Sequence, residues 1–83
     1  MAYWHSVCPV CEQGRLFVTK LLGTGELFVL CEECESAWKA PEQIDPETHY
    51  DFRGEPTAKA TRDDIEAAGW FRYQLNEVKR PAV

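Results

Sequence analysis

Hydrophobic residues in the first half of the chain fall into two runs, at 15–22 and 27–30. The segment between them, residues 23–26, contains two glycines, which supply the positive φ angles that tight turns need. Runs of this length, rich in β-branched and aromatic residues, predict the two antiparallel strands of a hairpin. Both strands carry apolar residues on both faces, whereas a free hairpin needs only one covered face. We therefore expect the C-terminal half of the chain, or a partner, to cover the second face.

Shorter patterns flank this hairpin. Residues 3–7 and 36–39 predict two further strands, and Pro41 ends the second of them because proline cannot donate to a ladder. Residues 41–44 are expected to form one helical turn, since proline is favourable in the first turn of a helix. Prolines, glycine and aspartate interrupt residues 45–60, which we expect to be the least structured part.

The region 61–69 has the signals of a complete short helix. Thr61 is a good N-cap for the Asp64 amide, and Gly69 stands where a glycine would end the helix. Ile65 and Ala68 are expected to face inward, and so short a helix must dock on the sheet to be stable. After it, the aromatic residues of 70–75 predict a last strand, in which Trp70 and Phe71 point to opposite faces. Residues 76–83 are expected to be a frayed tail.

All four cysteines lie in two Cys-x2-Cys pairs, separated by the nineteen residues 12–30. This spacing is typical of a zinc site, because each pair can turn tightly and the hairpin can bring both pairs together. Four thiolates suit Zn²⁺ and leave no coordination position for water, so such a site is structural. Disulfides are the alternative. The N-terminus shows no secretory signal, which favours a cytoplasmic protein with reduced thiols. The predicted ligands are Cys8, Cys11, Cys31 and Cys34.

The two cysteine motifs, CPVC and CEEC, resemble the knuckles of the zinc-ribbon superfamily over about the first half of the chain. Ribbon knuckles often have glycine directly after the second cysteine, but here those positions are Glu12 and Glu35, and the nearest glycine is Gly14. We therefore expect a wider first turn. Rubredoxins share the cysteine pattern, which keeps iron as an alternative metal.

The resemblance and the predicted elements together imply a small α+β fold. Its core is a metal-stapled zinc-ribbon antiparallel β-sheet, with one short C-terminal helix. Residues 1–83 are expected to be one domain, consisting of the zinc ribbon (1–40), a loop (41–60), the helix and final strand (61–75) and the tail (76–83). No apolar run is long enough to span a membrane.

The net charge of −5 changes the expected partners. A nucleic-acid-binding protein usually presents a basic patch to phosphates, which makes nucleic acid an unlikely partner here. An acidic surface suits a basic protein, although acidity also simply keeps small proteins soluble. Aromatic residues in the polar loop can anchor a partner or pin the loop to the core. The candidate partner-binding residues are Glu32, Glu33, Glu35, Tyr50, Asp51 and Phe52.

Catalysis is not expected, because the chain has no Gly-rich phosphate loop and no Ser/His/acid arrangement, and a metal would occupy every cysteine. The expectation is therefore a non-catalytic zinc-binding protein-interaction module. The whole chain resembles small bacterial stand-alone zinc-ribbon proteins, which implies more concretely an acidic immunity protein that binds and neutralises a basic toxin. A nucleic-acid- or ribosome-associated zinc ribbon and a rubredoxin-like electron carrier are the alternatives.

Overall fold

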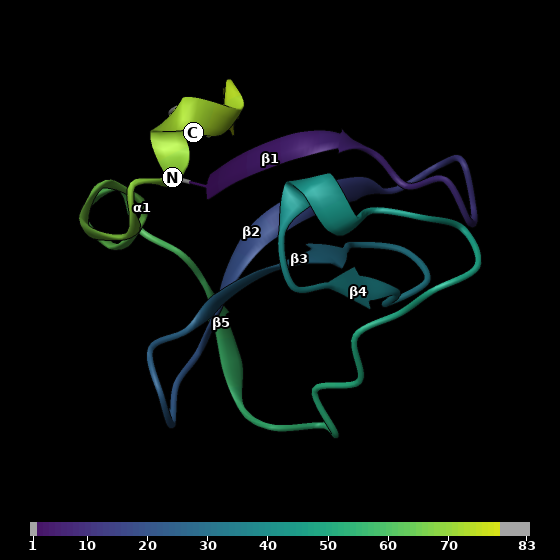
Figure 1. The fold of residues 1–83 in the computed structure, drawn as a ribbon, viewed down its shortest axis with the longest axis horizontal. Helices are drawn as coiled ribbons and strands as arrows, with labels where there is room; N and C mark the ends of the chain where they lie inside the picture. The colour runs from purple at the N-terminus through teal and green to yellow at the C-terminus, as the bar shows by residue number, and fades with distance from the viewer. Residues whose placement is uncertain (1, 79–83) are drawn as a thin grey trace, which may run out of the picture.

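An antiparallel sheet is the central feature of the computed structural model, which describes residues 2–78 (Figure 1). Within that range one α-helix, α1, and two 3-10 turns, η1 and η2, accompany six strands. The bounds are β1 (Ala2–Val7), β2 (Arg15–Leu21), β3 (Leu27–Cys31), β4 (Ala37–Trp38), η1 (Pro41–Gln43), β5 (Thr57–Lys59), α1 (Arg62–Ala68), η2 (Trp70–Tyr73) and β6 (Asn76–Val78). The predicted class, a small α+β fold with one short helix near the C-terminus, is confirmed. No helix in this range is long and apolar enough to span a membrane.

The predicted hairpin is formed by β2 and β3. Their register runs without interruption from Leu16 opposite Cys31 to Lys20 opposite Leu27. The connecting turn closes where the Gly25 amide donates to the Leu21 carbonyl over 2.7 Å, with Gly25 at φ 80°. β3 also pairs with β4, so the sheet order is β4-β3-β2-β1-β6. The hairpin therefore carries Cys31 directly to the connection between β3 and β4.

Two strands share the other edge of β2. β1 pairs with its first half, with Trp4 opposite Phe17, and β5 pairs with its second half, with Thr19 opposite Lys59. β5 lies in the stretch that we expected to be the least structured, and for residues 57–59 that expectation is wrong. Three residues are too few to show a strand period, and β2 supplies the hydrogen bonds that hold them.

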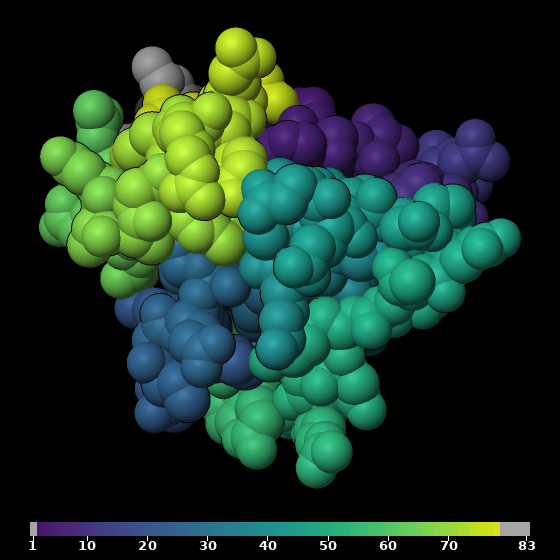
Figure 2. Space-filling model, viewed as in Figure 1, coloured from purple at the N-terminus to yellow at the C-terminus, as the bar shows by residue number. Residues whose placement is uncertain are grey.

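Both faces of the sheet are covered by the chain itself. Leu16 and Val18 are buried in a cluster that also contains Ile65 of α1 and Trp70 of η2. Phe28 lies in a second cluster, with Tyr50 and Phe52 packed against it. Figure 2 shows the C-terminal segment in yellow-green beside the teal segment that contains η1, and together they cover one side of the molecule. The expectation that the C-terminal half covers the hairpin is confirmed.

The helix α1 has the predicted ends. The Asp64 amide donates to the Thr61 hydroxyl over 3.1 Å, and the Thr61 amide donates to the Asp64 carboxylate over 2.9 Å. Gly69 ends the helix in the left-handed conformation at φ 72°. Ile65 is fully buried in the core, but Ala68 is exposed, so the expected inward direction is right for Ile65 and wrong for Ala68.

The chain after α1 differs from the prediction. Residues 70–73 form η2 instead of a strand, because Gly69 and Gln74, both with positive φ, bracket a single 3-10 turn. Trp70 is 9% exposed and Phe71 is 40% exposed, so one ring still enters the core and the other does not. Residues 76–78, expected to be part of a frayed tail, form β6 and pair with β1. The rest of that predicted tail, 79–83, lies outside the described residues.

Candidate metal centre

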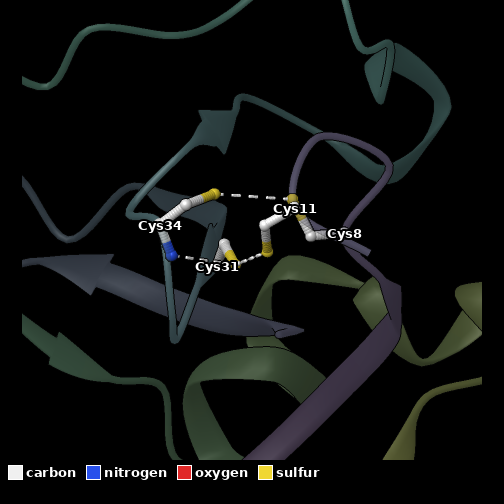
Figure 3. Close-up of side chains that lie close together, drawn as sticks. All are labelled: Cys8, Cys11, Cys31 and Cys34. Atoms are coloured by element: carbon white, nitrogen blue, oxygen red, sulfur yellow. Dashed lines mark hydrogen bonds between the residues drawn. The ribbon is translucent and has the colours of Figure 1, made fainter. Parts of the chain in front are cut away.

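The two cysteine pairs meet in one cluster (Figure 3). All four Sγ atoms lie within 4.8 Å of one another, and the Cys8–Cys34 and Cys11–Cys31 sulfurs are 3.7 and 3.6 Å apart. A tetrahedral ion with metal–sulfur bonds of about 2.3 Å separates its sulfurs by about 3.8 Å. A disulfide would hold two sulfurs at about 2.05 Å, and the four cysteines are free thiols. The structure thus forms a four-cysteine site that could hold a metal ion.

Each pair sits in a tight connection between two strands, which we call the first knuckle (residues 8–14) and the second knuckle (residues 31–36). In the first knuckle the Cys8 amide donates to the Gly14 carbonyl over 2.8 Å. In the second the Cys31 amide donates to the Ser36 carbonyl, also over 2.8 Å. The closing hydrogen bond of the first knuckle therefore spans one residue more than that of the second, so the first turn is the wider of the two.

The positions directly after the second cysteine of each knuckle adopt the conformation that glycine favours. Glu12 has φ 56° and Glu35 has φ 62°, both in the left-handed region. This conformation costs a non-glycine residue roughly 1–2 kcal/mol. The knuckles thus keep a left-handed turn without the glycine, and two glutamates hold a strained backbone beside the sulfurs.

Gly14 has a steric role in the site that the sequence does not predict. A Cβ built on Gly14 would lie 2.5 Å from Cys31 Sγ and 3.0 Å from the Glu33 Cβ. Gly14 does not have a positive φ, so the requirement for glycine is steric: the second knuckle approaches its Cα closely. The only signal in the sequence was its place at the end of the first knuckle, and that place does not reveal the contact.

Backbone amides point at the sulfurs. The amides of Val10 and Gly14 donate to Cys8 Sγ and Cys11 Sγ, each over 3.4 Å. In the second knuckle, the amides of Glu33 and Cys34 donate to Cys31 Sγ over 3.4 and 3.5 Å. Hydrogen bonds of this kind stabilise the charged form of an acid, so the knuckles are arranged for thiolates.

The four thiols have different environments. Burial raises the pKa of the Cys31 thiol to about 12, and burial also raises the pKa of Cys8. The Ser36 hydroxyl, whose Oγ lies 3.3 Å from Cys34 Sγ, is the main cause that lowers the pKa of Cys34 to about 6. A bound cation would offset the cost of ionising the buried Cys8 and Cys31 thiols, because a coordinated thiol is deprotonated.

The acidic residues proposed for partner binding are placed differently from one another. Glu32 is held by Arg15, whose Nε lies 2.8 Å from its carboxylate and whose amide also donates to it. Glu33 and Glu35 are exposed on the second knuckle. All three residues are exposed, but the carboxylate of Glu32 is already engaged by Arg15.

The aromatic residues proposed for partner binding contact the core. The Tyr50 and Phe52 rings pack on Phe28, with centroids 5.6 and 5.2 Å away, and both side chains are half-buried. Asp51 between them is exposed and accepts a hydrogen bond from the Arg53 amide. The two rings therefore pin this loop to the sheet, and partner binding by residues 50–52 stays a prediction.

Comparison with known proteins gives little further information. No family model matches the chain, and no solved structure matches it. An uncharacterized protein of Acanthamoeba polyphaga mimivirus is 45% identical over 42 residues, which is 47% of this chain and 35% of that protein. The chain thus spans about a third of the curated relative it matches. The two Cys-x2-Cys pairs in an antiparallel sheet are consistent with a zinc-ribbon-like fold.

Proposed function

We propose that this chain is a non-catalytic module whose four cysteines bind one structural zinc ion. The observation that carries the proposal is the sulfur cluster, with contacts of 3.6 and 3.7 Å between the knuckles. Four thiolates in a tetrahedron are a common structural zinc site, and Zn²⁺ binds such ligands more tightly than Fe²⁺ does. Because four protein ligands leave no position for water or substrate, the metal would hold the fold rather than perform chemistry.

Elemental analysis of the purified protein tests this proposal. We expect one zinc per chain and a colourless protein. One iron per chain, with the visible absorption of an iron–thiolate centre, would favour the rubredoxin-like alternative. No bound metal at all, with the thiols still reduced, would contradict the proposal.

The proposed biological role is binding to a basic protein, in its most concrete form as an immunity protein that neutralises a basic toxin. The net charge of −5 and the exposed carboxylates of Glu33 and Glu35 support this role. Such charges steer a basic partner and raise the association rate, an effect that salt screens. A partly buried aromatic such as Tyr50 would contribute affinity by slowing dissociation.

Charge-reversal variants test this role once a partner has been captured from the native cell. The double variant Glu33→Lys with Glu35→Lys should slow association and flatten its salt dependence, and Tyr50→Ala should speed dissociation. Glu66→Lys, an exposed position on α1, serves as the matched control and should change neither rate strongly. Unchanged kinetics in all variants would place the interface elsewhere. Tight, salt-sensitive binding to RNA or DNA would favour the nucleic-acid alternative instead.

A further inference from the structure

The four cysteines differ in their access to solvent. Cys34 is exposed and Cys11 is half-buried, whereas Cys8 and Cys31 are each only 1% exposed. Oxidation of a cysteine requires a thiolate that the oxidant can reach. Under the proposed function, on which this inference rests, all four are thiolates, so accessibility decides which one reacts. Cys34 is therefore the cysteine most open to a peroxide in solution.

Two sulfur–sulfur contacts cross from one knuckle to the other. Two of the dashed lines in Figure 3 mark these contacts: Cys34 Sγ to Cys8 Sγ, 3.7 Å away, and Cys11 Sγ to Cys31 Sγ, 3.6 Å away. We propose that Cys34 is a site of oxidation by peroxide and that Cys8 is the cysteine that resolves it. The product is a Cys8–Cys34 disulfide between the knuckles, and a second molecule of hydrogen peroxide would join Cys11 to Cys31 by the same two kinds of step.

The two steps balance with one hydrogen peroxide. The Cys34 thiolate attacks a peroxide oxygen, the O–O bond breaks, hydroxide leaves and Cys34 becomes a sulfenic acid. The Cys8 thiolate then attacks the Cys34 sulfur, the S–S bond forms, the S–O bond breaks and a second hydroxide leaves. Two thiolates have lost two electrons, and the peroxide has gained them.

The product has a consequence for the fold. Only Cys11 and Cys31 remain as thiolates, which are too few to retain a four-coordinate ion. The new bond nevertheless ties the same two knuckles that the metal would tie. Oxidation would thus release the ion and leave a covalent link in its place, instead of simply unfolding the sheet.

Peptide mapping of the wild-type protein tests the disulfide directly. After metal analysis, the protein is treated with one equivalent of hydrogen peroxide, its free thiols are blocked with N-ethylmaleimide, and it is digested with trypsin. Cleavage after Arg15, Lys20 and Lys39 separates the first knuckle, in peptide 1–15, from the second, in peptide 21–39. The expected product is these two peptides linked, with the label on Cys11 and Cys31. Separate peptides, each with a disulfide inside its own knuckle, would overturn the inference.

A variant tests the role of Cys34 separately. Cys34→His keeps a ligand at this position, since three cysteines and one histidine also hold zinc. The variant is expected to retain its metal at a peroxide dose that releases the metal from the wild-type protein. Metal release equal to that of the wild type would show that oxidation starts at another cysteine. If the variant binds no metal, the wild-type peptide map decides. A wild type without metal would contradict the proposed function, while its peptide map would still decide the pairing.

Discussion

Gly14 is where the two knuckles come closest. Because a Cβ at this position would lie 2.5 Å from Cys31 Sγ, Gly14→Ala must push the second knuckle away from the first. Overpacking of this kind costs about 1–3 kcal/mol, and here it also displaces a cysteine that we propose as a metal ligand. We predict a lower melting temperature in thermal unfolding and weaker zinc binding in competition with a chelator. Gly23→Ala is the matched control, because nothing lies within 4 Å of its Cβ and its φ is not positive. Equal behaviour of the two variants would contradict the steric role of Gly14.

Glu35 offers a test in the opposite direction. Its left-handed backbone, at φ 62°, costs a non-glycine residue roughly 1–2 kcal/mol, and glycine would not have this cost. Part of the stability gained with glycine is lost again, because glycine makes the unfolded chain more flexible. Glu35→Gly should therefore stabilise the protein by roughly 0.5–1 kcal/mol in denaturant unfolding. Glu35→Gln removes the charge alone and should give a smaller effect. Glu33→Gly, at a position without positive φ, should destabilise. A destabilised Glu35→Gly variant would argue against the strain at this knuckle.

At the scale of elements, α1 depends on its first turn. Thr61→Ala removes the hydroxyl that accepts from the Asp64 amide, and losing such a cap costs about 1 kcal/mol. The loss should appear as a lower denaturant midpoint with an unchanged slope. Thr61→Ser keeps the acceptor oxygen and should stay close to the wild type. If the Thr61→Ala and Thr61→Ser variants have the same denaturant midpoint, the cap does not stabilise this helix.

The elements that could be predicted from the sequence are those with local signals. The hairpin has apolar runs around a glycine turn, and α1 has Thr61 and Gly69 at its ends, so both were found. β5 and β6 were missed because each has three residues, and their ladder bonds come from β2 and β1, far away in the sequence. Residues 70–73 have the composition of a strand, but Gly69 and Gln74 turn the backbone at both ends. The pairing of strands that are distant in sequence and the sign of the φ angle are properties that composition does not reveal.

At the scale of the whole molecule, the cysteine cluster was predictable and its detail was not. Two Cys-x2-Cys pairs joined by a hairpin are sufficient to expect one four-sulfur site. The need for Gly14, by contrast, comes from a sulfur seventeen residues further along the chain. The different exposure of Cys34 and Cys31 likewise depends on how the knuckles pack against the sheet. The aromatic residues at 50 and 52 were recognised, but only the structure shows them on Phe28.

The cluster joins the β1–β2 connection to the β3–β4 connection, so a bound metal would hold the sheet together at one end. In such sites the binding free energy of the metal, on the order of 10 kcal/mol, is also folding free energy. Replacing any one of the four cysteines by serine, for example Cys31→Ser, should therefore unfold the protein or weaken it severely. The core of a chain this small rarely provides enough stability by itself.

Titration of zinc into metal-free, reduced protein tests this account most directly, with folding followed by amide NMR spectra. We predict that the metal-free chain lacks the dispersed spectrum of a packed sheet. We also predict that the folded spectrum grows in proportion to added zinc, is complete at one equivalent per chain and is lost again with a chelator. A metal-free, reduced protein that already shows the full folded spectrum, with no change on adding zinc, would contradict the coupling of zinc binding to folding.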